Sequence, residues 1–121
     1  MIREFTDLIS WQAAHQLLLM VYKIAKNFPK EEMFGLKSQM QRAALSVTSN
    51  IAEGFGRRGY KERIQFYYLA QGSLTEVKNQ AIAARDIGYL SKEGYNELLA
   101  QSNMAHKLLQ GLISKSKTFL S

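Results

Sequence analysis

The sequence predicts an all-α protein: an antiparallel up-down-up-down four-helix bundle formed by one domain over residues 1–121. Three observations predict this fold. Apolar residues recur at steps of three and four along four segments, which is the spacing of one helix face. The chain has a single proline, at position 29, so long helices can run without interruption. No useful length of sequence alternates apolar and polar residues as a strand does, and the connections between segments are short.

The first two helices are predicted from their apolar stripes and from the residues that end them. The first stripe covers residues 11–28 and ends before Pro29, because the residue preceding a proline avoids helical geometry. The second stripe covers residues 36–55 and stops in a cluster of glycines. Gly54 and Gly56 are expected to cap this helix, at a place where a positive φ favours glycine.

The third and fourth helices follow in the same way. The third stripe covers residues 64–84 on a broad arc, and this helix ends at Gly88. Ser91 is placed to cap the start of the fourth helix, whose stripe covers residues 95–112. Each helix is expected to have about 20 residues and so a length of roughly 30 Å.

The apolar arcs of the first and third helices are wider than one bundle seam requires. Part of that surface is therefore expected to be buried against other copies of the chain, which predicts a homo-oligomer. The alternative is a monomer with a generous core.

Composition limits the possible locations and chemistry. The chain has no cysteine, which excludes disulfides and thiolate metal sites and is compatible with a reducing cytoplasm. The first eight residues, MIREFTDL, lack the apolar core of a signal peptide, and the longest apolar run, residues 17–22, is far shorter than the roughly 20 residues of a membrane span. We therefore expect a cytoplasmic protein that makes no use of a membrane.

The net charge of +6 is unevenly distributed. Residues 1–33 carry equal numbers of basic and acidic groups, residues 34–90 carry an excess of +4, and residues 91–121 an excess of +2. A basic middle of the chain can attract nucleic acid or another anionic surface. A solvated helical surface would have the same composition, so charge alone does not decide between the two.

Three glycines in the stretch SNIAEGFGRRGYKER, residues 49–63, spell GxGxxG. A dinucleotide-binding turn needs a strand before these glycines and a helix that opens at them. Here the preceding residues follow helical spacing back to Leu36, so the glycines close a helix and the pattern is a coincidence of spacing. We therefore expect no dinucleotide cofactor.

Nothing else in the sequence indicates catalysis. His15 and His106 are isolated, the Glu-x-x-His motif of di-iron bundles is missing, and Glu53 has no evident base, nucleophile or metal partner. We expect a protein that is not an enzyme and holds no metal or other cofactor.

Four basic residues lie within seven positions after the glycines, and we call them the basic corner: Arg57, Arg58, Lys61 and Arg63. Arginines after a helix can simply complement its dipole, but the planar guanidinium also matches phosphate. Phe55 and Tyr60 lie among them. If exposed, these rings would favour base stacking and nucleic acid, and if buried they would favour a protein-binding scaffold. Arg42 and Lys37 are weaker candidates for phosphate contacts.

A polar stripe along the second helix forms the last candidate feature. Its members share one helix face: Arg42, Ser46, Ser49, Asn50, Glu53 and Arg57. The stripe could face solvent or form a hydrogen-bond network between helices or subunits. We expect Ser49, Asn50 and Glu53 to serve such a structural network rather than catalysis.

Five stretches of the chain carry a family resemblance: DLISWQAA, the Phe28-Pro29 pair, GLKSQMQRAALSVTSNIAEGFGRR, AQGSLTEV and DIGYLS. Together they resemble the small four-helix-bundle proteins encoded in intervening sequences of bacterial 23S ribosomal RNA genes. Residues 49–54, SNIAEG, are the most specific part. Thr48, where many members have proline, and Lys78, where an acidic residue is common, depart from the family pattern.

This resemblance implies more than the residues themselves indicate. The family resembles the accessory proteins of diversity-generating retroelements, which form pentameric rings with a basic surface and bind nucleic acid. It therefore implies a homo-oligomer, by analogy a pentamer, that binds RNA or DNA and has no established enzymatic activity. A protein-protein interaction scaffold with no nucleic-acid role is the alternative.

Overall fold

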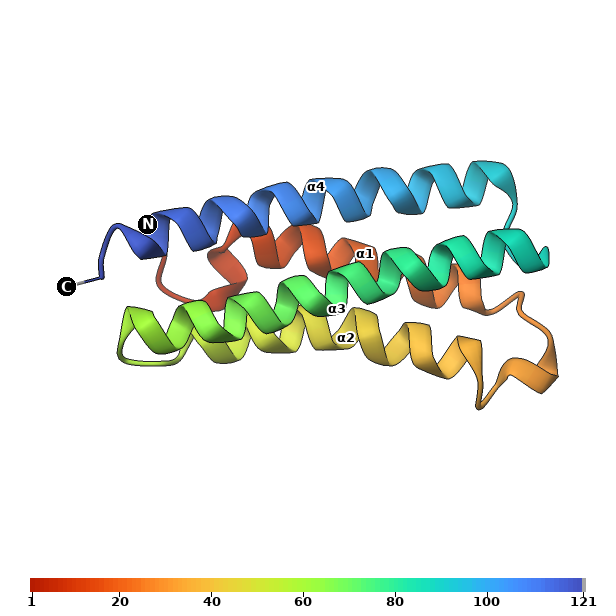
Figure 1. Ribbon diagram of the computed structural model, residues 1–121, viewed down its shortest axis with the longest axis horizontal. Helices are drawn as coiled ribbons and strands as arrows, with labels where there is room; N and C mark the ends of the chain where they lie inside the picture. The colour runs from red at the N-terminus through yellow and green to blue at the C-terminus, as the bar shows by residue number, and fades with distance from the viewer. Residues whose placement is uncertain (121) are drawn as a thin grey trace.

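The computed structural model describes residues 1–120 and contains four long helices (Figure 1). They are α1 (Ile9–Ala25), α2 (Leu36–Phe55), α3 (Tyr60–Ile87) and α4 (Lys92–Lys117), with short 3-10 turns η1 (Phe5–Asp7) and η2 (Lys30–Glu32). No strand occurs within residues 1–120, so the predicted all-α class is confirmed. The prediction of about 20 residues per helix is wrong for α3 and α4, which have 28 and 26 residues, because both continue through polar turns beyond their apolar stripes.

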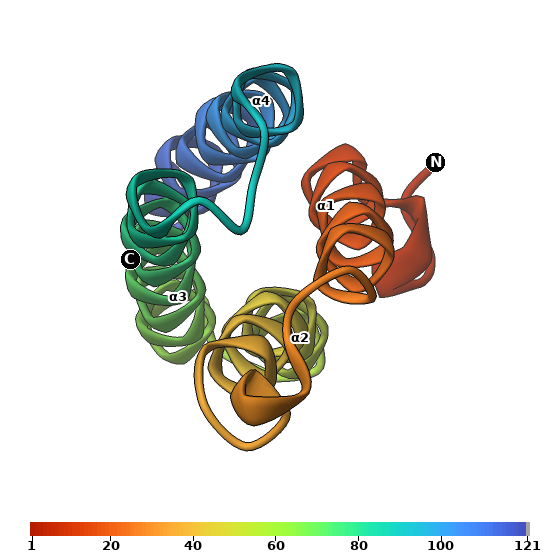
Figure 2. The ribbon, with the colours of Figure 1, turned by 90° about the vertical axis from the view of Figure 1, so that its right-hand side faces the viewer.

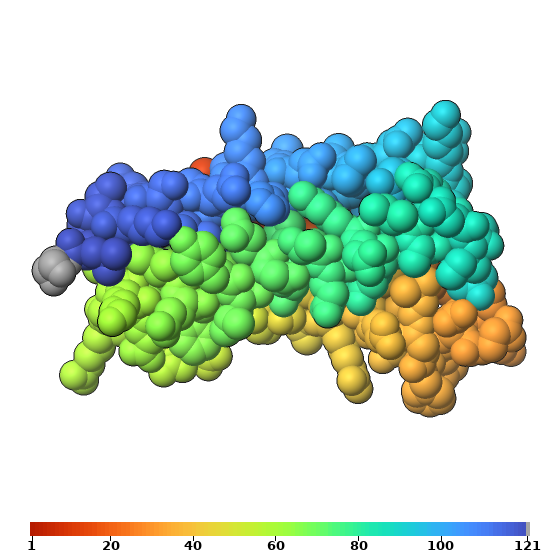
Figure 3. All heavy atoms as spheres, viewed as in Figure 1, coloured from red at the N-terminus to blue at the C-terminus, as the bar shows by residue number. Residues whose placement is uncertain are grey.

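The helices form a four-helix bundle in which neighbours in sequence are neighbours in space. α2 packs against α1 and α3, and α4 packs against α3 and α1, whereas α1 and α3 lie diagonally opposite each other across the core. The end-on view shows α1 and α3 at opposite corners (Figure 2). Side chains fill the space between the ribbons on the face formed by α2, α3 and α4 (Figure 3).

The core consists of the predicted apolar stripes. Each helix contributes fully buried aliphatic side chains, among them Leu17, Ile51, Leu74 and Leu109. Trp11, expected on the core face of the first helix, is only half-buried, and its indole stacks on the imidazole of His15 with ring centroids 4.8 Å apart.

One end of the bundle, which we call the closed end, contains the α1–α2 and α3–α4 connections. Phe28 packs against Tyr89 with ring centroids 5.4 Å apart, and the Tyr89 hydroxyl donates a 2.9 Å hydrogen bond to Glu32 Oε2. The other oxygen of Glu32 accepts a 3.0 Å bond from the backbone N–H of Leu36. Both hydrogen bonds stabilise the charged form of Glu32 and therefore lower its pKa. The bond from Leu36 has the larger effect and the bond from Tyr89 the smaller.

Two predicted helix boundaries at the closed end are confirmed. Gly88 ends α3 with a φ of 98°, the left-handed conformation that glycine adopts without steric cost. Ser91 caps α4, because its Oγ accepts a 3.0 Å hydrogen bond from the N–H of Gly94.

The expected reason for the two glycines at the end of α2, Gly54 and Gly56, is wrong. Gly56 is the C-cap of α2, but its φ of −78° is open to any residue, and Gly88 is the one glycine of residues 1–120 with a positive φ. Gly54 is required for a different reason. A Cβ at this position would lie 2.8 Å from Tyr67 Cε1 and 2.9 Å from Phe66 Cβ, so its hydrogen lets α2 and α3 approach closely.

Within residues 1–120, no helix has both the length and the apolar character that crossing a bilayer requires.

Candidate nucleic-acid interface

The other end of the bundle, which we call the open end, is where α1 and α3 begin and α2 and α4 end. The sequence ranges that meet there are 1–10, 50–70 and 107–120. They contain eight basic and four acidic residues, a net charge of +4 out of the +6 of the whole chain. The closed end and the middle of the bundle therefore share the remaining +2. The basic corner lies in this region, on the turn between α2 and α3 and on the first turn of α3.

Arg57 is largely engaged within the chain. Its guanidinium lies 3.6 Å from a Glu53 carboxylate oxygen and 3.4 Å from a Glu62 carboxylate oxygen. Its Cζ also lies 4.6 Å from the centroid of the Phe66 ring. Two carboxylates therefore offset much of its charge, and less of that charge is available to an external anion than the sequence suggested.

Arg63 stabilises the turn between α2 and α3. Its Nε donates a 2.7 Å hydrogen bond to the backbone carbonyl of Arg57, just beyond the end of α2. The Arg63 Cζ lies 4.8 Å from the Tyr60 ring centroid and 5.2 Å from that of Phe55. For this residue the helix-terminus explanation is correct, because the side chain satisfies a carbonyl at the negative end of α2.

Arg58 and Lys61 differ from the two packed arginines. Both are exposed, and neither forms an ion pair with any residue of the described chain. The basic corner thus consists of two arginines that build the turn and two cations that remain available to an external anion.

The two aromatic residues of the corner are half-buried, so they are neither the exposed rings nor the fully buried rings that the sequence left as alternatives. Tyr60 stacks on Phe119 with ring centroids 4.9 Å apart, and Arg63 lies against both Tyr60 and Phe55. Because these contacts occupy the rings, the corner offers no free platform for a nucleobase.

The structure does not bring Arg42 and Lys37 to the basic corner. Lys37 lies in the first turn of α2 at the closed end, separated from Arg57 by about 30 Å of helix. Arg42 is exposed midway along α2, beside a groove that Glu76 and Gln80 also line. Neither residue can share a phosphate with the corner.

The polar stripe of α2 does contain a hydrogen-bond network, but with different members from those predicted. Asn50 Nδ2 donates to the backbone carbonyl and to Oγ of Ser46, at 2.9 Å and 3.0 Å. Ser46 Oγ in turn lies 2.8 Å from Oγ of Ser73 on α3. Asn50 takes part in this network, whereas Ser49 and Glu53 are exposed and lie outside it.

Ser73 is the member of this network that sequence reasoning missed. Its only signal is its place among small residues in the AQGSLTEV stretch of α3, which faces α2. The network joins two helices through short side chains and contains no titratable group. It can fix the register of α2 against α3 but has no evident means of catalysis.

Comparisons with known proteins bear on the whole chain. Residues 6–111 match the family described as 23S rRNA-intervening sequence protein. The fold is also similar to the 1.70 Å crystal structure of a protein with unknown function from the S23 ribosomal protein family of Bacteroides thetaiotaomicron. That likeness has a TM-score of 0.77 and 20% identity, covers 86% of this chain and 97% of the other, and shows the fold alone. Among the curated proteins, none matches. Because the family match extends over most of the chain, the protein belongs to the 23S rRNA-intervening sequence protein family.

Proposed function

We propose that this protein is a non-enzymatic homo-oligomer that binds the backbone of RNA or DNA through its open end. The observation that carries the proposal is the pair of exposed, unpaired cations, Arg58 and Lys61, at the end of the bundle that has most of the net charge. Arg57 and Arg63 support them by shaping the turn between α2 and α3.

The contacts at the corner favour phosphate over bases as the ligand group. Phe55 and Tyr60 are covered by other side chains, so stacking would require them to rearrange. Lysine and arginine contacts to phosphate carry no base information, and the binding should therefore be insensitive to sequence. Two free cations per chain give weak binding, and several copies must act together to make it useful.

The exposed apolar side chains support a ring of copies. On α1, Leu19 is 50% exposed and Tyr22 is also exposed, and on α3, Leu69 is 58% exposed beside the exposed Tyr68. Because α1 and α3 occupy opposite corners, these two surfaces face different directions. Contact between the α1 surface of one copy and the α3 surface of the next is heterologous, and repetition of such a contact forms a ring when the rotation from copy to copy closes on itself.

Gly72 adds support to this ring. It lies in α3 near Leu69 and is exposed, and a Cβ there would meet no atom of the chain within 4 Å. Packing within one chain therefore does not require a glycine at position 72, in the middle of this helix. A neighbouring copy that packs closely against α3 would require one. The family likeness favours five copies in the ring.

The mass of the particle tests the assembly. Light scattering at micromolar concentration should give several chains for the parent, and Leu19→Glu or Leu69→Glu should reduce the mass toward one chain while circular dichroism stays helical. Phe34→Glu is the matched control, because Phe34 is 91% exposed in the α1–α2 connection, away from both surfaces. A parent mass equal to one chain would exclude the ring.

Binding to labelled single-stranded RNA and DNA at several salt concentrations tests the ligand. The double variant Arg58→Gln/Lys61→Gln should weaken binding and reduce the salt slope by roughly 0.7 for each phosphate that is no longer neutralised. The control Lys23→Gln/Lys26→Gln removes the same charge at the closed end and should change affinity less. Equal losses of affinity in the two double variants would mean that only net charge matters. An unchanged affinity in the Arg58→Gln/Lys61→Gln variant would favour the alternative function, a protein-protein interaction scaffold. The exposed apolar faces of α1 and α3 support that alternative.

A further inference from the structure

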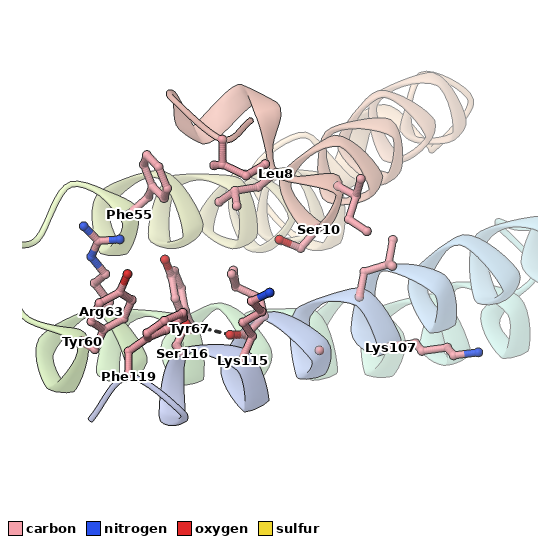
Figure 4. Close-up of a pocket in the computed structure, with 15 residues that line it drawn as sticks. Leu8, Ser10, Phe55, Tyr60, Arg63, Tyr67, Lys107, Lys115, Ser116 and Phe119 are labelled. Atoms are coloured by element: carbon pink, nitrogen blue, oxygen red, sulfur yellow. Dashed lines mark hydrogen bonds between the residues drawn. The ribbon is translucent and has the colours of Figure 1, made fainter. Parts of the chain in front are cut away.

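A cavity of about 500 Å³ opens between the start of α1 and the ends of α2 and α4 (Figure 4). This volume lies within the range of sites for small organic ligands. Its wall is mostly apolar, with Leu8, Phe55, Leu108, Leu112 and Phe119 as the main contributors.

A buried hydroxyl without a partner lies in the wall of this cavity. Ser10 is 2% exposed, and its Oγ has no hydrogen-bond partner among residues 1–120. Figure 4 shows this oxygen directed from α1 toward the space between the helices. Buried polar groups in folded proteins nearly always have partners, so a hydroxyl that lacks one beside an open cavity is placed to bond to a water molecule or to a polar group of a ligand.

The remaining polar groups around the cavity are hydrogen-bond donors or cations. Lys115 extends from α4 toward Ser10, and the Arg63 guanidinium lies at the side of α2, whereas the Lys107 ammonium points away (Figure 4). Burial raises the pKa of Tyr67, which keeps its phenol in the neutral, donating form. The lining includes no aspartate or glutamate.

We propose that this cavity binds a small amphiphilic carboxylate, with its carboxylate near Ser10 and Lys115 and its apolar body against Leu8, Leu108 and Leu112. A carboxylate accepts the bonds that these donors offer and supplies the countercharge that Lys115 lacks within residues 1–120. The proposal is independent of nucleic-acid binding, because Arg58 and Lys61 do not line the cavity.

The same polar groups argue against a second copy of the chain as the occupant. An apolar segment of another copy would fill the volume but leave Ser10 Oγ unsatisfied and Lys115 without a countercharge. A copy approaching by its own open end would also bring a surface of net charge +4 against this one.

Titration of the full-length protein with decanoate, below its micelle concentration and followed by calorimetry, tests the proposal. We expect saturable binding of one decanoate per chain. Decanol and decyltrimethylammonium share the apolar tail but lack the negative charge, and each should bind at least about tenfold more weakly.

Variants locate the site. Lys115→Gln should weaken decanoate binding by roughly tenfold and Ser10→Ala by several-fold, whereas Lys107→Gln, which removes the same charge from a side chain that points away, should leave it nearly unchanged. Gly111→Leu should abolish binding, because Gly111 lines the cavity, a Cβ there meets no described atom within 4 Å, and the added side chain can occupy the cavity. Its control is Ala100→Leu, which adds side-chain volume at an exposed position of the same helix outside the cavity.

Equal affinity for decanoate and decyltrimethylammonium would overturn the proposal, and so would equal effects of Lys115→Gln and Lys107→Gln. If decanoate does not bind, and if Gly111→Leu lowers the particle mass measured by light scattering, a neighbouring copy fills the cavity and the proposal is wrong. Arg58→Gln/Lys61→Gln should bind decanoate as the parent does, which separates this result from the nucleic-acid test.

Discussion

The two ends of the bundle are built from the same kind of helix but differ in how their polar groups are satisfied. At the closed end, Phe28 and Tyr89 pack together, and Glu32 accepts hydrogen bonds from Tyr89 and Leu36. At the open end, Ser10 Oγ has no partner among residues 1–120 and a cavity remains beside it. The side chains of the closed end thus satisfy one another, whereas those around the open-end cavity leave polar groups and space for a ligand.

The strongest effect should come from Gly54, because the open end depends on the close approach of α2 and α3 there. Gly54→Ala places a Cβ within 3 Å of Tyr67 and Phe66 and should lower the free energy of unfolding by about 1–3 kcal/mol. Gly72→Ala is the matched change at an open position and should raise the stability of a single chain by about 0.5–1 kcal/mol. Urea titration followed by circular dichroism measures both. Equal effects would mean that α2 and α3 are not closely packed at Gly54.

The next largest effect comes from comparing a carboxylate of the closed end, Glu32, with a carboxylate of the open end, Glu53. Glu32→Gln should lower the melting temperature clearly, because both oxygens of Glu32 accept hydrogen bonds, whereas Glu53→Gln, which removes only an exposed ion pair with Arg57, should change it little.

The pH dependence of Glu32 has a definite sign. Its pKa is lowered in the folded protein, so the stabilisation is fully present above the ordinary pKa of 4.5 and is lost as the pH falls through the folded value. Glu32→Gln should therefore flatten the loss of stability in acid. Parallel acid melting profiles for the parent and the Glu32→Gln variant would contradict this role of Glu32 at the closed end.

The weakest effect lies within the basic corner. Arg63→Gln should cost about 1 kcal/mol, because it removes the hydrogen bond to the Arg57 carbonyl and the packing on Tyr60. Arg58→Gln should change stability by less than about 0.5 kcal/mol, since Arg58 is exposed and unpaired. Thermal unfolding of the two variants compares them directly, and equal destabilisation would show that the corner does not divide into packed and free cations.

Much of the fold could be predicted because its signals are local. Pro29, Gly88 and Ser91 mark helix boundaries through their own backbone preferences, and the apolar stripes identify the core. The role of Gly54 could not be predicted, because it depends on Tyr67 and Phe66 on the neighbouring helix.

The candidate site could be predicted only in part, because it too depends on contacts between residues that are distant in the sequence. Clustering of charge in the sequence identified the basic corner, but its division into packed and free cations depends on Arg63 reaching back to the Arg57 carbonyl. The cavity left no trace in the sequence, since Ser10 and Lys115 lie near opposite ends of the chain and meet only through the bundle.

Amide hydrogen exchange of the protein, with and without single-stranded RNA at low salt, is the most direct test of nucleic-acid binding at the open end. We expect RNA to slow exchange in the turn and first helical turn around residues 57–63 and to leave the closed end, around residues 28–36 and 88–94, unchanged. Protection at the closed end with none around residues 57–63 would contradict binding through the open end.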